Sequence, residues 1–141
     1  MTDQAGSELE GKVAIVTGAG RMRGIGRGTA TVLARMGAHV VVTGTGRDPA
    51  SYPKDEKDAD WRDIHSTAEQ IEAFGVRALP LVSNIADQED VQKMIDATVA
   101  EFGRLDIIVN NAAAPYGNDR VSVMDMQTDV FKSIVDVKLM G

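Results

Sequence analysis

A glycine-rich stretch, TGAGRMRGIGRG, is the part of this sequence best suited to binding chemistry. It spans Thr17 to Gly28, holds five glycines and three arginines, follows an apolar run and precedes a segment of helical period. Glycine permits sharp turns and close approach of the backbone to a ligand. The free N–H groups and the dipole at a helix start attract anions. The stretch predicts a loop that holds a pyrophosphate group, with an ordinary tight turn as the alternative.

The other residue types that could bind metals or act as nucleophiles do not form a pattern. The sequence has no cysteine, and its two histidines, His39 and His65, have no second ligand at metal-binding spacing. The acidic residues of 46–60 form a charged run that is typical of a solvated loop. We therefore predict no metal site.

Length and charge exclude several classes of protein. The chain has 141 residues and a formal net charge of −6, so it is long enough for one domain with a core and too acidic for a typical nucleic-acid binder. It contains no apolar run of membrane-spanning length and no signal-peptide pattern at its start. We expect a cytoplasmic protein without nucleic-acid or membrane partners.

Short apolar runs rich in β-branched residues alternate with segments of helical period. Strands are predicted over residues 12–17, 39–43, 76–82 and 105–110, and helices over residues 25–36, 61–74, 87–102 and from about 123 onward. The residues at helical spacing in the first helix are Ile25, Thr29, Val32, Leu33 and Met36. Asp87 is expected to cap the third helix, and the first three helices are expected to end at Gly37, Gly75 and Gly103. Near-continuous apolar strands are typical of a parallel sheet covered on both faces. This alternation predicts an α/β layer fold over residues 12–141, preceded by an N-terminal extension, residues 1–11.

Several motifs in chain order resemble the short-chain dehydrogenase/reductase family. Thr17-Gly18 with Gly24-Ile25-Gly26 is similar to the family's Thr-Gly-x-x-x-Gly-Ile-Gly loop. The stretches SNIAD (83–87), NNAA (110–113) and DVKLMG (136–141) resemble its Asp-Val-Ser-Asp, Asn-Asn-Ala-Gly and Asp-Val-Asn-Leu-x-Gly motifs. The resemblance implies a doubly wound Rossmann fold with strand order 3-2-1-4. It also implies hydride transfer between a nicotinamide cofactor and a small carbonyl or alcohol substrate.

Carried over residue by residue, the resemblance implies a cofactor site. It places Gly18, Gly24, Ile25 and Gly26 along the pyrophosphate, Asn84 and Ile85 beside the adenine, and Asn110 and Ala112 beside the ribose and nicotinamide. Lys138 aligns with the family asparagine that anchors a proton-relay water, and it is the one candidate catalytic residue. A lysine there is either a tolerated variant or a sign of weakened relay chemistry.

The glycine-rich loop is longer than the family pattern. Five residues separate Gly18 from Gly24, so the loop is expected to bulge, with Gly20 providing the extra turn. Divergent enoyl-thioester reductases of the family have a similar spacing, which keeps such an activity as an alternative. The Gly-Ile-Gly and Asn-Asn-Ala elements favour an ordinary carbonyl or alcohol member.

The cofactor form is predicted from charge. An NAD site has an acidic residue at the end of the second strand, whereas an NADP site has a cation near the 2′-phosphate. The strand here ends TGTGR, so Thr45 and its neighbours carry no acid. Arg47 follows the strand, while Arg21 and Arg23 lie in the bulge. The sequence predicts NADP, and Asp48 keeps NAD as the alternative.

The serine, tyrosine and lysine that perform proton transfer in the family have no counterparts before Gly141. We expect a second polypeptide that carries the C-terminal half of the fold, in a homo- or hetero-oligomer, and an inactive chain on its own. A non-catalytic nucleotide-binding subunit is the alternative from another class. A methyltransferase-type fold is disfavoured, because it requires an acid at the end of the second strand.

Overall fold

The four predicted strands form one parallel sheet in the computed structural model, which describes residues 7–114, 117 and 119–141. They are β1 (Val13–Val16), β2 (His39–Gly44), β3 (Ala78–Val82) and β4 (Ile107–Val109). The sheet order is β3-β2-β1-β4, and each neighbouring pair is parallel. The predicted fold class and strand order are confirmed. Residues 1–6 of the predicted N-terminal extension lie outside the described residues.

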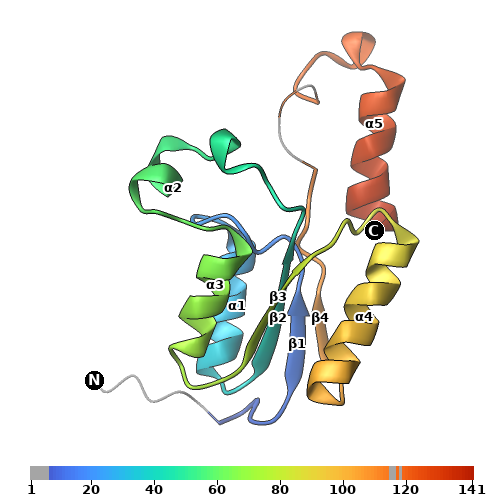
Figure 1. Ribbon diagram of the computed structural model, residues 1–141. Coiled ribbons are helices and arrows are strands. Elements are labelled where there is room, and N and C mark those ends of the chain that lie inside the picture. The colour runs from blue at the N-terminus through green and yellow to red at the C-terminus, as the bar shows by residue number, and fades with distance from the viewer. Residues whose placement is uncertain (1–6, 115–116, 118) are drawn as a thin grey trace.

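Helices cover both faces of the sheet (Figure 1). Helices α1 (Ile25–Arg35) and α3 (Ile64–Glu72) lie on one face, and α4 (Gln88–Phe102) lies on the other. The remaining elements are η1 (Pro49–Ser51), α2 (Lys54–Asp58), η2 (Val123–Asp125), α5 (Thr128–Val135) and the π-helical turn η3 (Asp136–Met140). Helix α5 stands beyond the end of α4, away from the sheet (Figure 1). No helix in the described part of the chain is long and apolar enough to cross a membrane.

Alternate side chains of the central strands fill two cores. Val16, Val40 and Val42 pack toward α1 and α3. Ile15 and Val41 pack toward α4, against Met94 and its neighbours. Because successive side chains of a strand point to opposite faces, a strand buried on both faces must be apolar at nearly every position. This explains the near-continuous apolar runs of β1 and β2.

Of the residues predicted at helical spacing in α1, Leu33 packs against the core, but the most buried face is formed by other residues. Ile25 is 81% exposed and Val32 is 51% exposed, whereas Gly26, Ala30 and Ala34 are buried. These small residues share one helical face and let the helix axis approach the sheet closely. The bulkier β-branched residues at neighbouring positions therefore point to solvent, which a search for large apolar side chains does not anticipate.

The charged run 46–60 also differs from the predicted solvated loop. It contains η1 and α2, and it buries Tyr52 and Glu56, whose exposed fractions are 8% and 2%. We call residues 46–63 the insert. Its buried charge is tolerated because Arg47 lies beside it, as described below.

The predicted helix ends are largely confirmed. The Asp87 carboxylate caps α4 by accepting hydrogen bonds from the N–H groups of Glu89 and Asp90 at 2.8 and 3.2 Å. Gly37, Gly75 and Gly103 follow α1, α3 and α4 with positive φ, as expected for a C-terminal cap. The last helix, expected from about residue 123, begins with the separate turn η2 and becomes α-helical only at Thr128.

Candidate cofactor-binding site

The glycine-rich loop connects β1 to α1 at the carboxyl edge of the sheet. Gly18 has φ +67°, and a Cβ built there would lie 2.7 Å from the Cα of Ala112. A Cβ on Gly26 would lie 2.5 Å from Asn111 Nδ2 and 2.7 Å from the Gly18 carbonyl oxygen. Both positions therefore require glycine, since the loop passes directly against the segment that follows β4.

Thr17 and Asn111 hold these two segments together. The amide N–H groups of Asn111 and Ala112 donate to Thr17 Oγ1 at 3.1 and 3.0 Å. Asn111 Nδ2 donates to the carbonyl oxygens of Thr17 and Gly18 at 2.9 and 3.1 Å. The prediction from sequence placed Asn110 beside the ribose and nicotinamide but gave Asn111 no role. The doublet of asparagines after a strand was the available signal.

Groups from the insert and the start of α3 bind the backbone of the bulge. Trp61 Nε1 donates to the Gly20 carbonyl oxygen at 2.6 Å, and Thr67 Oγ1 donates to the Ala19 carbonyl oxygen at 2.8 Å. The Met22 N–H donates to Glu56 Oε1 at 2.9 Å. Buried backbone groups without partners are costly, so these bonds compensate for the extra length of the loop.

Arg47 lies between two buried carboxylates. Its Nη1 is 3.0 Å from Glu56 Oε2 and its Nη2 is 2.6 Å from Asp63 Oδ1, with a further bond from Nε to Asp63 Oδ1 at 3.0 Å. The guanidinium carbon lies 4.7 Å from the centroid of the Tyr52 ring. Burial opposes the charge of Arg47, but the hydrogen bonds to Asp63 and Glu56 outweigh it and raise its pKa. Arg47 therefore stays charged, and we call Arg47, Glu56 and Asp63 the insert cluster.

The backbone of Asp63 is strained. Its φ and ψ angles are +55° and −130°, a combination that costs a residue with a side chain on the order of 1–3 kcal/mol. The Asp63 side chain makes no capping bond to α3. Its carboxylate instead lies against Gly20, where a built Cβ would be 2.1 Å from Oδ1.

The three arginines predicted near a 2′-phosphate have different surroundings. Arg21 is exposed and forms no ion pair within the described ranges. The Arg23 side chain is 80% exposed and pairs with Asp55 at 2.8 Å. Arg47 lies between Glu56 and Asp63 of the insert cluster, and Thr45, close to it in sequence, is exposed.

The residues predicted at the adenine and nicotinamide ends follow β3 and β4 at the same edge. Asn84 is exposed, and its Oδ1 accepts from the Ala86 N–H at 3.1 Å. Ile85 is half-buried beside the end of η3, since a Cβ on Gly141 would lie 2.9 Å from Ile85 Cδ1. Asn110 is exposed and Ala112 is half-buried. Lys138 is exposed on η3.

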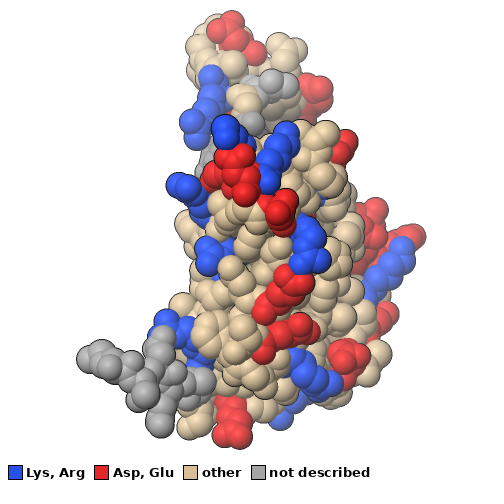
Figure 2. Space-filling model, turned by 60° about the vertical axis from the view of Figure 1, so that its left-hand side comes forward, with Lys and Arg blue, Asp and Glu red and all other residues tan. Residues whose placement is uncertain are grey.

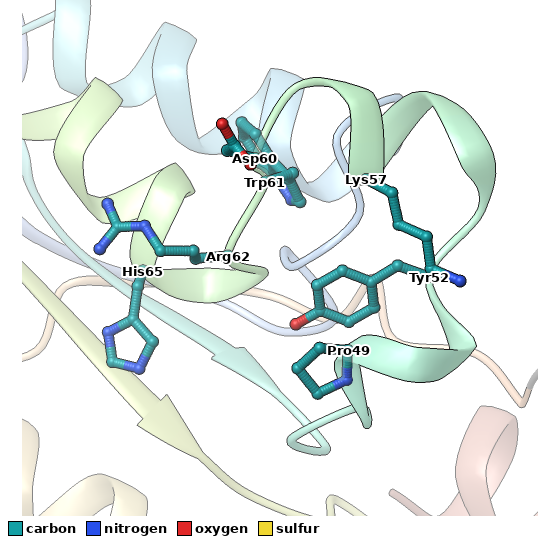
Figure 3. Close-up of a pocket in the computed structure, with 7 residues that line it drawn as sticks. All are labelled: Pro49, Tyr52, Lys57, Asp60, Trp61, Arg62 and His65. Atoms are coloured by element: carbon teal, nitrogen blue, oxygen red, sulfur yellow. The ribbon is translucent and has the colours of Figure 1, made fainter.

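The outer side of the insert has an open hollow of about 490 Å³ (Figure 3). Pro49 and Tyr52 line it near η1, and Trp61, Arg62 and His65 line it near the start of α3. Its cations are engaged, because Lys57 Nζ donates to the Ala50 carbonyl oxygen at 2.8 Å and Arg62 pairs with Glu69. Acidic and basic side chains are interspersed on the face that α3 and the insert share (Figure 2).

The geometry of the loop fits a dinucleotide pyrophosphate. Gly18 and Gly26 keep side chains away from the loop backbone. The first turn of α1 carries no acidic residue, and Gly24 at its N-cap provides no capping side chain. The N–H groups of that turn are therefore open to an anion. Together with the parallel sheet and the position at the first βα connection, this defines a Rossmann fold of the dinucleotide-binding class.

Sequence comparison gives the family. The short chain dehydrogenase family model matches residues 12–141, and the chain therefore belongs to the short-chain dehydrogenase/reductase family. It is 40% identical over 134 residues to a short chain dehydrogenase/reductase of Aspergillus oryzae, covering 94% of this chain and 44% of that protein.

Solved structures agree with this assignment. Carveol dehydrogenase from Mycobacterium avium in complex with NAD superposes with a TM-score of 0.77 at 27% identity, covering 94% of this chain and 46% of that one. A short chain dehydrogenase from Burkholderia cenocepacia in complex with NADP gives 0.72 at 33% identity, covering 94% and 47%. The chain spans less than half the length of these relatives.

Proposed function

We propose that this chain forms the cofactor-binding part of an oxidoreductase that transfers hydride between a nicotinamide dinucleotide and a small carbonyl or alcohol substrate. The glycine-rich loop carries the proposal, because Gly18 and Gly26 leave room for backbone alone beside the open start of α1. The nicotinamide ring, when bound, supplies the hydride chemistry.

The chain's own residues act by binding and orienting. The N–H groups at the start of α1 would hold the pyrophosphate, and Asn84 with Ile85 would contact the adenine. Asn110 and Ala112 would orient the nicotinamide end. Lys138 remains the one candidate for proton relay, while the tyrosine, serine and lysine of the family would come from a C-terminal half outside these residues. A partner polypeptide and an oligomer stay predictions, as does a cytoplasmic location.

The finer prediction from the sequence is NADP. Exposed Arg21 and Arg23 support it, since both can approach a 2′-phosphate without breaking a buried contact. Arg47 supports it less, because its guanidinium is already paired with two carboxylates. The relatives include complexes with NAD and with NADP, so the charges near the end of β2 decide the preference.

Cofactor titration and turnover together test the proposal. The purified protein should bind NADH or NADPH by fluorescence titration, and the protein supplemented with a C-terminal half should oxidise the reduced cofactor in the presence of a carbonyl substrate. Binding without turnover in the complete assembly would favour the non-catalytic nucleotide-binding subunit. Turnover confined to enoyl thioesters would favour the enoyl-reductase alternative. Absence of nicotinamide binding would contradict the proposal.

A further inference from the structure

The end of β2 lacks the acid that meets a ribose 2′-hydroxyl in NAD sites. In dinucleotide-binding folds that acid stands about 20 residues after the glycine fingerprint. Here the corresponding position falls in the stretch Thr43-Gly44-Thr45, which has no carboxylate. Gly44 has no side chain, and residues from the start of α3 lie beside it, with Ile64 Cγ2 3.0 Å from a Cβ built at Gly44.

Asp63 lies beside Gly44 at the start of α3. A Cβ built on Gly44 would lie 3.4 Å from Asp63 Oδ2, and a Cβ built on Gly20 would lie 2.1 Å from Asp63 Oδ1. The carboxylate therefore sits between the end of β2 and the glycine-rich loop. The missing side chain of Gly20 gives the carboxylate its room, and Gly44 is within van der Waals distance of it on the other side.

The charge of the insert cluster disfavours a 2′-phosphate. One arginine faces two carboxylates, whose side chains are 3% and 7% exposed, so the cluster has a net negative charge. The Arg47 nitrogens are committed within the protein, since Nη2 also lies 3.5 Å from the Gly20 carbonyl oxygen. A neutral hydroxyl can donate to a carboxylate, whereas a phosphate group is repelled by one.

We infer that Asp63, held by Arg47, replaces the strand-end acid missing from β2, so that the site binds NAD more tightly than NADP. This inference rests on the proposed function and goes against the NADP preference predicted from the sequence. That preference rested on the missing strand-end acid and on Arg23 and Arg47 as cations, and Arg47 is paired with two carboxylates in the fold. The sequence places Asp63 well beyond the strand, and only the fold brings it back to Gly44.

Equilibrium titration of the purified protein with NADH and NADPH measures the preference directly. Trp61 is the single tryptophan and donates to the glycine-rich loop, so its fluorescence reports binding. We expect NADH to bind at least about tenfold more tightly than NADPH, as one buried charge near the 2′-position predicts. The Asp63→Asn variant keeps the shape of the side chain, and asparagine tolerates positive φ. It should reduce the preference about tenfold, mainly by tightening NADPH.

Two further variants distinguish the effect of the position of the Asp63 carboxylate from the effect of the net charge of the protein. Glu56→Gln removes the same charge from the insert cluster on the side that bonds to Met22, and we expect a smaller change in preference, about threefold. Asp58→Asn removes a carboxylate that is 62% exposed on α2, and it should leave the preference unchanged. Circular dichroism shows whether each variant is folded.

The outcomes distinguish this inference from the proposed function. If the wild-type protein binds NADPH as tightly as NADH, or more tightly, the inference is overturned while nicotinamide binding stands. The same holds if folded Asp63→Asn keeps the wild-type preference. If Asp63→Asn does not fold, the inference is tested by two other results: the ratio of the NADPH and NADH dissociation constants of the wild-type protein, and the change in that ratio in Glu56→Gln. Binding of neither cofactor overturns both.

Discussion

Two regions of the sheet differ in how completely their side chains are enclosed. The enclosed side is formed by the central strands β1 and β2 beside α1 and α3, and the other side is formed by the edge strand β4 with α5. On the side of β1, β2, α1 and α3, the strand residues are at most 1% exposed from Val13 to Val16 and from Val40 to Thr43. On the side of β4 and α5, Ile108 is 49% exposed, and every residue of α5, all of them described, is at least partly exposed. The first side is a finished core, and the second is only partly covered.

The difference extends to charge and to function. The insert cluster is buried on the enclosed side, and its groups bond to the backbone of the glycine-rich loop. The ion pair between Lys132 of α5 and Asp136 of η3, at 2.6 Å, lies at the surface, where such pairs contribute little. The loop proposed for the pyrophosphate is thus hydrogen-bonded on the enclosed side. The segment assigned to the nicotinamide end leaves the less covered strand.

The largest expected effect comes from a matched pair of substitutions across this boundary. Ile15 and Ile108 are register partners in β1 and β4, yet Ile15 is 0% exposed and Ile108 is 49% exposed. We expect Ile15→Ala to lower the free energy of unfolding by about 2–5 kcal/mol and Ile108→Ala by about 1 kcal/mol. Urea denaturation of both variants measures the difference. Equal losses of unfolding free energy in the two variants would show that β4 is covered in solution, and would contradict the difference between the two regions.

A second pair of substitutions, Gly18→Ala and Gly28→Ala, tests the close approach of the glycine-rich loop to the segment after β4. Gly18→Ala forces a Cβ within 2.7 Å of the Ala112 backbone at φ +67°, and we expect a cost of about 3 kcal/mol. Nicotinamide binding should weaken strongly, because the loop must move away from the segment after β4. Gly28→Ala meets no atom within 4 Å and should be neutral or slightly stabilising in a helix. Thermal unfolding and cofactor titration check both variants, and similar behaviour of the two would contradict the close approach.

Much of this fold could be read from the sequence because periodicity and helix ends are local signals. Alternation of apolar runs with helical segments indicated the four strands and their parallel arrangement, and Gly37, Gly75 and Gly103 marked the helix ends. The buried face of α1 could not be found this way. Burial there depends on how closely the helix approaches the sheet, which favours Gly26 and Ala30 over larger residues.

The candidate site was predictable only where the motif is contiguous. The loop from Gly18 to Gly26 is such a motif, whereas its supports come from far along the chain. Glu56 belongs to the charged run 46–60, which looks solvated in one dimension, and Trp61 and Asp63 follow it in the segment predicted as the helix 61–74. Which carboxylate of that stretch becomes buried depends on tertiary placement, since the Arg47 guanidinium can satisfy only the groups beside it.

The smallest expected effect concerns Asp106, which joins the two sides at the start of their strands. Its carboxylate accepts from the Val13 N–H at 2.9 Å and pairs with Arg104 at 2.6 Å. The hydrogen bond from Arg104, followed by the one from Val13, lowers the pKa of Asp106 from 3.8 to about 2. A carboxyl group whose pKa is lowered by folding stabilises the fold above its unfolded pKa, and this contribution is lost as the pH falls through the folded value.

Asp106→Asn should therefore be less stable than the wild-type protein at neutral pH, and the difference should vanish as the pH falls from about 4 to about 2. Thermal unfolding midpoints measured across this range test the expectation. Glu10→Gln is the control, because Glu10 is exposed in the turn before β1 and forms no ion pair with the described residues. Its midpoints should follow the wild-type curve at every pH. A wild-type acid transition that Asp106→Asn leaves unchanged would show that β1 and β4 are held together without this carboxylate.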